Sequence, residues 1–143
     1  MSYTRKERMN TILNYAFSKA KLEIYSGFYR KFIHVTVAVY GKDYFYGVNK
    51  GKTHPKAIIK YGYPAYSFIH SELDLLIHLG NNYISLQDVD VYNYCWSTRK
   101  LFKLQNEPRI SKPCMHCAQF IFDAKSVTFM DRNREWKTYV NDN

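Results

Sequence analysis

The sequence predicts an α/β fold in which helices pack on the faces of a mixed β-sheet. Helical and strand patterns alternate along the chain in the order αββαβαββ. At 143 residues, with 46% hydrophobic residues, the chain is long enough to bury a core and too apolar to be disordered. Because no repeat, low-complexity tract or linker interrupts the pattern, we expect one domain over residues 1–143.

The N-terminal half predicts a helix followed by a β-hairpin. Thr4 and Glu7 have the spacing of a capping box, and apolar residues recur on one face of the helix that follows. Residues 32–40 and 44–48 are rich in β-branched and aromatic residues, and the Gly-Lys-Asp turn between them favours antiparallel pairing. The polar, basic segment that continues through residues 49–66 is expected to be an irregular loop.

The second half predicts two helices, each followed by a strand. One helix is expected to begin near His70, and another at Pro113, since proline suits the first helical position. The strands that follow them are residues 89–96 and 126–130. Only a short turn separates the latter from residues 135–140, so these two strands are predicted to pair antiparallel.

Composition and charge limit the kinds of partner and the cellular compartment that we expect for this chain. A formal net charge of +9 attracts anions such as nucleotides or nucleic acid, although a solvated basic surface explains scattered lysines and arginines equally well. No apolar run approaches the ~20 residues of a membrane span, and the N-terminus lacks a signal-peptide core. Three cysteines, two of them close together, do not suggest a disulfide scaffold. We therefore expect a cytoplasmic protein with no membrane partner.

Two short motifs point to chemistry, and their combination is more specific than either alone. Cys114 and Cys117 at C-x-x-C spacing are compatible with a redox pair, half of a zinc site, or coincidence. His70 and Glu72 form an H-x-E arrangement, which by itself is weak evidence. Both motifs open helices that precede strands expected near the centre of the sheet. The strand order would therefore bring the two helix N-termini side by side.

Such a pair of helix starts suits a catalytic zinc ion. His70, Cys114 and Cys117 would supply three ligands of a tetrahedron and leave the fourth position for water. Helix N-termini favour the thiolate form of cysteine, and zinc lowers the pKa of bound water from ~15.7 towards ~7. Glu72 is too close to the histidine in sequence to be a comfortable fourth ligand, but it is well placed to move the water proton.

With these motifs the sequence resembles the zinc-dependent cytidine/deoxycytidylate deaminase superfamily, whose signature is H-x-E…P-C-x-x-C. The resemblance spans approximately residues 32–131 and is strongest to small phage- or bacteria-type members. It implies a three-layer α/β/α cytidine-deaminase-like fold with a mixed five-stranded sheet, and Zn²⁺ as cofactor. It also implies that zinc-bound hydroxide attacks C4 of cytosine, or C6 of adenine, while Glu72 shuttles the proton to the ring nitrogen and the leaving amine.

The resemblance further implies a set of substrate contacts. The family places an asparagine after the second strand, where it contacts the sugar, and often a His-Pro at the mouth of the site; Asn49 and His54 occupy these places. Ser71 replaces the alanine that is usual between the histidine and the glutamate, at a position that lines the base pocket. The expected substrate contacts are Asn49, His54, Ser71, Pro113, Trp96 and Lys52.

Three functions stay open, and we favour the first slightly. An antiparallel last strand is typical of the superfamily group that holds free-cytidine deaminases, which commonly assemble as homo-oligomers, and some toxin-like deaminases of nucleic acid. A nucleoside or nucleotide deaminase would use Lys50, Lys52 and Arg99 as phosphate contacts. A deaminase of single-stranded DNA or RNA would use the basic segments 50–60 and 97–112, with nearby aromatic residues for stacking. These aromatic residues are Tyr61, Tyr63, Tyr66 and Trp96.

The third function is a non-catalytic, zinc-stabilised nucleotide-binding module. Glu72 argues against this function, because structure alone needs no carboxylate there.

The other histidine, cysteine and aspartate candidates are interpreted as structural residues. His34 lies in an apolar strand and is expected to be a core or edge residue, and Cys95 a buried free thiol. Asp74 is expected on the surface of its helix.

Overall fold

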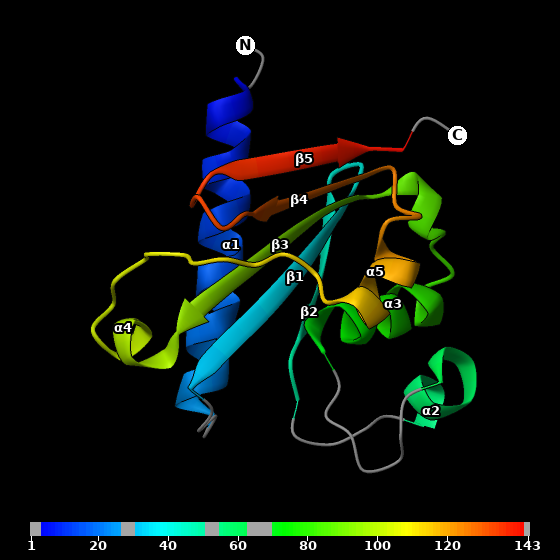
Figure 1. Ribbon diagram of the computed structural model, residues 1–143, viewed down its shortest axis with the longest axis horizontal. Helices are drawn as coiled ribbons and strands as arrows, with labels where there is room; N and C mark the ends of the chain where they lie inside the picture. The colour runs from blue at the N-terminus through cyan, green and yellow to red at the C-terminus, as the bar shows by residue number, and fades with distance from the viewer. Residues whose placement is uncertain (1–3, 27–30, 51–54, 63–69, 142–143) are drawn as a thin grey trace.

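The computed structural model describes residues 4–26, 31–50, 55–62 and 70–141, and its strands form one five-stranded sheet (Figure 1). The elements in chain order are α1 (Arg5–Tyr25), β1 (Phe32–Tyr40), β2 (Asp43–Val48), α2 (Pro55–Tyr61), α3 (Ser71–Asn81), the 3₁₀ turn η1 (Leu86–Asp88), β3 (Asp90–Ser97), α4 (Thr98–Phe102), α5 (Met115–Ile121), β4 (Ser126–Met130) and β5 (Trp136–Val140). Within the described ranges, no helix is both long and apolar enough to span a membrane.

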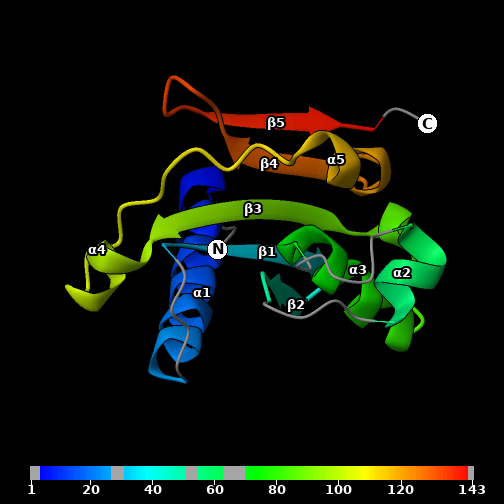
Figure 2. The same cartoon turned by 60° about the horizontal axis from the view of Figure 1, so that its bottom comes forward.

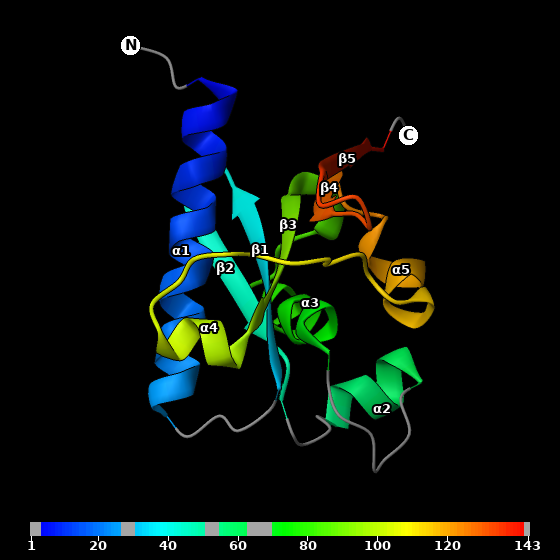
Figure 3. The ribbon, with the colours of Figure 1, turned by 60° about the vertical axis from the view of Figure 1, so that its left-hand side comes forward.

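The sheet has the mixed topology that the sequence predicts. Its strand order is β2-β1-β3-β4-β5, which can be followed from bottom to top in Figure 2. β3 and β4 pair in parallel, whereas the other neighbours pair antiparallel, including β4 with β5. Helix α1 packs on one face, and α3 and α5 pack on the other (Figure 3). The prediction of an α/β fold with helices on the faces of a mixed sheet is confirmed.

Alternation along β1 and β3 sends apolar residues to the face covered by α1 and several polar residues to the face covered by α3 and α5. On β1, Ile33, Val35 and Val37 are buried against α1. The intervening residues point the other way: Thr36 contacts Ser71 at the start of α3. β3 follows the same period of two, because Tyr94 packs with the α1 cluster while its neighbours face α3. The face covered by α3 and α5 therefore carries a polar stripe at its centre.

Two described helices lie where the sequence interpretation expects no helix. α2 falls within the expected loop 49–66, and α4 falls within the basic segment 97–112. α2 begins at Pro55, and proline favours the first position of a helix, so the sequence does carry a sign of where this helix starts. α4 has only five residues, which is too short for an apolar periodicity to appear.

The helix expected at Pro113 begins two residues later. Cys114 is the N-cap of α5, with the extended backbone angles φ −67° and ψ 164° that an N-cap residue adopts. Pro113 is buried just ahead of the cap. The proline therefore directs the chain into the helix without being part of it.

Gly47 allows β2 to lie against the start of α3. A Cβ added at this position would overlap backbone atoms of Leu75 and Ser71. We expect Gly47→Ala to lower the free energy of unfolding by about 1–3 kcal/mol, because the backbones must separate. Gly80→Ala, at a helical position where an added Cβ meets nothing, is the control and should be neutral or slightly stabilising. Equal urea midpoints for the two variants would contradict this close approach.

Candidate metal centre and active site

Three potential metal ligands meet where α3 and α5 begin. His70 is the N-cap residue of α3, Cys114 is the N-cap residue of α5, and Cys117 lies in the first turn of α5. Their ligand atoms all lie within 4.8 Å of one another. The helices are adjacent because each leads into one of the two parallel strands, β3 and β4. The structure thus brings together the three residues that the sequence motifs single out.

The distances between these atoms fit a zinc ion. His70 Nδ1 lies 3.4 Å from Cys114 Sγ and 3.4 Å from Cys117 Sγ. Zinc bonds of ~2.0 Å to nitrogen and ~2.3 Å to sulfur, at a tetrahedral angle, predict a separation of about 3.6 Å. His70 and Cys114 are exposed while Cys117 is buried, so the group is open to solvent on one side. One imidazole and two thiols therefore form a donor set that suits zinc with an open fourth position.

Cys114 and Cys95 differ in their chemistry. Hydrogen bonds from Cys117 and from His70 lower the pKa of the Cys114 thiol to about 3, so it is a thiolate at neutral pH. The thiolate is the form that binds metals. Burial instead raises the pKa of Cys95 to about 12, so this residue stays protonated. Cys95 is a buried free thiol, as the sequence predicts.

Glu72 is buried in the first turn of α3, where a hydroxyl group holds it. Glu72 is 5% exposed and Ser71 is 0% exposed. Ser71 Oγ donates a hydrogen bond of 2.8 Å to Glu72 Oε1. Ser71 Oγ also lies 2.8 Å from Thr36 Oγ1 on β1. Ser71 therefore connects the carboxylate to the sheet.

The hydroxyl contacts continue across the sheet to the segment that precedes Cys114. Thr36 Oγ1 donates to Asn93 Oδ1 on β3 at 2.6 Å, and Asn93 Nδ2 donates to the Ser111 carbonyl at 2.7 Å. Ser111 Oγ in turn donates to the Asn93 carbonyl at 2.7 Å. All three residues are buried, so these contacts restrict their side chains to one arrangement. The network links the two helix starts through the polar stripe of the sheet.

Asn49 is anchored to β1 just after the end of β2. Its Oδ1 accepts a hydrogen bond of 2.9 Å from the His34 backbone N–H, and its Nδ2 donates to the Phe32 carbonyl at 3.3 Å. Both ends of the amide thus hold the chain that leaves β2 against β1. Among the other expected substrate contacts, Lys52 and His54 lie outside the described residues, as do Tyr63 and Tyr66.

Trp96 is not part of this site. It is fully buried in the cluster against α1, where its ring lies 5.9 Å from that of Phe17. Its Nε1 donates to Asn106 Oδ1 at 3.0 Å. Because β3 alternates, Trp96 points to the face opposite the metal centre, and its expected contact with substrate is corrected to a core position.

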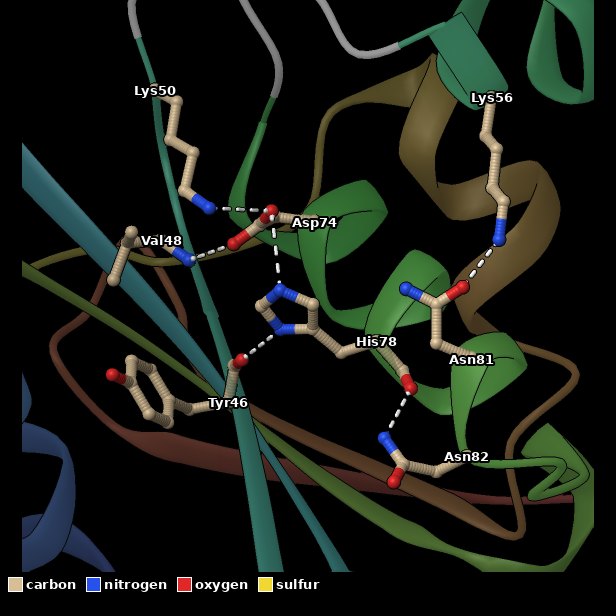
Figure 4. A network of polar contacts seen from close by, with 8 residues as sticks. All are labelled: Tyr46, Val48, Lys50, Lys56, Asp74, His78, Asn81 and Asn82. Carbon is tan, nitrogen blue, oxygen red and sulfur yellow. Dashed lines mark hydrogen bonds and ion pairs between the residues drawn. The ribbon is translucent and has the colours of Figure 1, made fainter.

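Asp74 is buried, and the expectation that it lies on the helix surface is wrong. Its carboxylate accepts a hydrogen bond of 3.0 Å from the Val48 backbone N–H and pairs with Lys50 Nζ at 3.1 Å (Figure 4). His78 Nε2 lies 3.9 Å from the same carboxylate, and His78 Nδ1 donates to the Tyr46 carbonyl. Helix α3 is enclosed by β2 on this side. Lys50 is therefore already neutralised by a carboxylate.

The structure places His34 beside the site, where the sequence interpretation missed it. His34 Nε2 lies 3.6 Å from Cys95 Sγ. Burial lowers the pKa of His34, while the nearby Glu72 carboxylate acts to raise it and His70 to lower it. The missed signal is the alternation of residues 32–40, because the buried Ile33 and Val35 face α1 and leave His34 for the opposite face.

Comparison with known proteins supports the fold. No protein-family model matches the sequence, and no curated protein matches it. The chain is similar in structure to cytidine deaminase from Burkholderia pseudomallei, whose crystal structure was solved at 1.6 Å. The TM-score is 0.52 and the identity 13%, and the match covers 87% of each chain. The chain therefore has the mixed α/β architecture of the cytidine deaminase-like fold, with a His-Cys-Cys group that could hold a metal.

Proposed function

We propose that the chain is a single-domain, zinc-dependent hydrolytic deaminase that converts cytosine to uracil in a nucleoside or nucleotide. The observation that carries this proposal is the meeting of one imidazole and two cysteine sulfurs at zinc distances, with the buried Glu72 carboxylate two residues beyond the histidine. The similarity to a cytidine deaminase in fold supports it.

His70, Cys114 and Cys117 would hold the zinc ion. When bound, zinc would supply a water molecule whose pKa is lowered towards ~7, and so a nucleophile at neutral pH. In the net reaction, water adds to C4 of cytosine and ammonia leaves, which gives uracil. The protein must therefore remove a proton from water and deliver protons to the ring nitrogen and the departing amine.

Glu72 would perform these proton transfers. Ser71 holds Glu72 Oε1, and among the described residues Oε2 has no hydrogen-bond partner, so this second oxygen can face the reacting water. Thr36 Oγ1 lies against the Ser71 hydroxyl and is itself held by its hydrogen bond to Asn93. A carboxylate held in this way keeps its orientation between the two transfers, which is what general acid–base catalysis requires.

Mass spectrometry of a substrate panel tests the proposal. The zinc-loaded protein is incubated with cytidine, deoxycytidine, their monophosphates, adenosine, and single-stranded DNA and RNA oligonucleotides, with Glu72→Ala as control for contaminating enzymes. We expect uracil from a cytosine nucleoside or nucleotide, detected as a mass increase of about one dalton. Conversion of oligonucleotides alone would replace the proposed substrate with a polynucleotide. Absence of turnover on every substrate, with zinc present, would favour the non-catalytic binding module.

A further inference from the structure

The segment between α4 and α5 runs along β3 on its way to the metal centre (Figure 1). β4 pairs only with residues 90–92 of β3, and the segment before α5 hydrogen-bonds to the second half of β3 instead. The backbone N–H of Arg109 donates to the Cys95 carbonyl at 2.9 Å, and Ser111 exchanges hydrogen bonds with Asn93. These contacts fix Arg109 at the end of β3, five residues before Cys114.

The Arg109 guanidinium packs against the ring of Phe32 at the start of β1. Its carbon Cζ is 4.1 Å from the centre of the Phe32 ring, a cation–π distance. Phe32 and His34 share one face of β1 because they are two residues apart. The charge of Arg109 lowers the pKa of Cys95, after the larger effect of burial, while the Glu72 carboxylate raises it. Arg109 and Glu72 therefore both lie near Cys95, whose sulfur is 3.6 Å from His34 Nε2.

Several cations of the chain have a carboxylate partner, and Arg109 is among those in the described ranges that do not. Lys50 pairs with Asp74, Arg8 with Asp90, and Lys100 with Glu107. Among the described residues, no carboxylate lies within ion-pair distance of Arg109, although its side chain is only partly exposed. A partly buried guanidinium without a counterion is a favourable place for a phosphate, which it can bind through two parallel hydrogen bonds.

We propose that Arg109 binds a phosphate group of the substrate, so that the site takes a phosphorylated cytosine substrate in preference to free cytidine. This inference rests on the proposed function, with the cytosine ring at Glu72 and the phosphate at Arg109, on either side of His34. The same chemistry fits the 5′-phosphate of a mononucleotide or a phosphate of a single strand. Lys50, which the sequence suggests for this role, is paired with Asp74.

Calorimetric titration without turnover tests the assignment. The zinc-loaded Glu72→Ala protein is titrated with CMP, with cytidine and with a short cytosine-containing single strand, and Arg109→Gln is then added to the same background. We expect the second substitution to weaken CMP binding by about ten- to a hundredfold and to leave cytidine binding within twofold. Arg5→Gln, which removes the same charge from α1 on the opposite face, should leave both affinities unchanged.

The outcomes separate the two sources of phosphate and the two proposals. Weakened binding of the oligonucleotide, with no measurable CMP binding, would assign Arg109 to a polynucleotide phosphate. Equal affinities for CMP and cytidine, unchanged by Arg109→Gln for any ligand, would overturn the inference. Failure of the proposed function shows itself differently, as absence of uracil from every substrate in the native protein. A circular dichroism melt of Arg109→Gln checks that the variant is folded, so that a loss of phosphate affinity is not a consequence of unfolding.

Discussion

Replacing Glu72 by glutamine is expected to reduce the rate of cytosine deamination by about 10²- to 10⁴-fold while zinc binding is retained. Glutamine has nearly the same shape and can still accept the hydrogen bond from Ser71, so the fold and the metal centre should persist. What it cannot do is take a proton from water and return it to the substrate. The measurement is kcat on the best substrate, together with zinc content by mass spectrometry.

A matched substitution separates this chemistry from a general effect of charge. Glu7→Gln removes a carboxylate from the exposed first turn of α1, on the opposite side of the sheet. It should leave kcat within twofold. If Glu72→Gln kept the native kcat with zinc bound, the carboxylate would not be the proton shuttle, and the proposed mechanism would be wrong.

Cys117→Ser is expected to abolish both zinc retention and turnover. Cys117 is the buried member of the ligand group, so no solvent-exposed alternative can replace its sulfur. Zinc that binds only the folded state stabilises it, by about 4 kcal/mol when zinc is present at a thousand times its Kd. The variant that no longer binds zinc loses this stabilisation. We expect zinc content near zero and a melting temperature that no longer rises when zinc is added.

Cys95→Ser is the control for this experiment, since Cys95 is a buried cysteine that does not belong to the ligand group. This variant should keep the native zinc content even if its stability falls. Were Cys117→Ser to hold zinc as firmly as the native chain does, the assignment of the metal centre to His70, Cys114 and Cys117 would fail.

The sequence is sufficient to predict the meeting of His70, Cys114 and Cys117 and most strands, for an identifiable reason. His70, Glu72, Cys114 and Cys117 lie in short motifs whose spacing is set by local chemistry, and the order of helices and strands determines that the motifs meet. The long runs of β-branched and aromatic residues are similarly local signals. α2 and α4 were missed because a helix of five or seven residues hardly develops a periodic pattern.

The side of a strand or helix to which an individual side chain points is harder to predict, because it depends on contacts between distant parts of the chain. Trp96 and Cys95 are neighbours on β3, yet one packs against α1 and the other against His34. Which of the two faces the site depends on the register of β3 against β1. Asp74 follows the same rule, since the buried side of α3 is defined by β2, which is far away in sequence.

Arg109 shows most clearly what composition alone leaves undecided. The net charge of +9 is spread over the chain, and the sequence suggests Lys50, Lys52 and Arg99 as phosphate ligands but gives no sign of Arg109. In the structure, several of these cations are neutralised by carboxylates, whereas Arg109 is held against Phe32 beside the site. Ion pairing is a property of the fold, so the distinction appears only once the side chains are placed.

The most direct test of the account is the deamination rate measured against zinc bound per chain. Metal-free protein is prepared with a chelator, zinc is returned in steps, and uracil formation from CMP and from cytidine is followed at each step. We predict no activity without zinc and a rate that rises in proportion to bound zinc, up to about one ion per chain. Deamination at full rate by metal-free protein would contradict the account, as would a fully zinc-loaded protein that forms no uracil from any cytosine substrate.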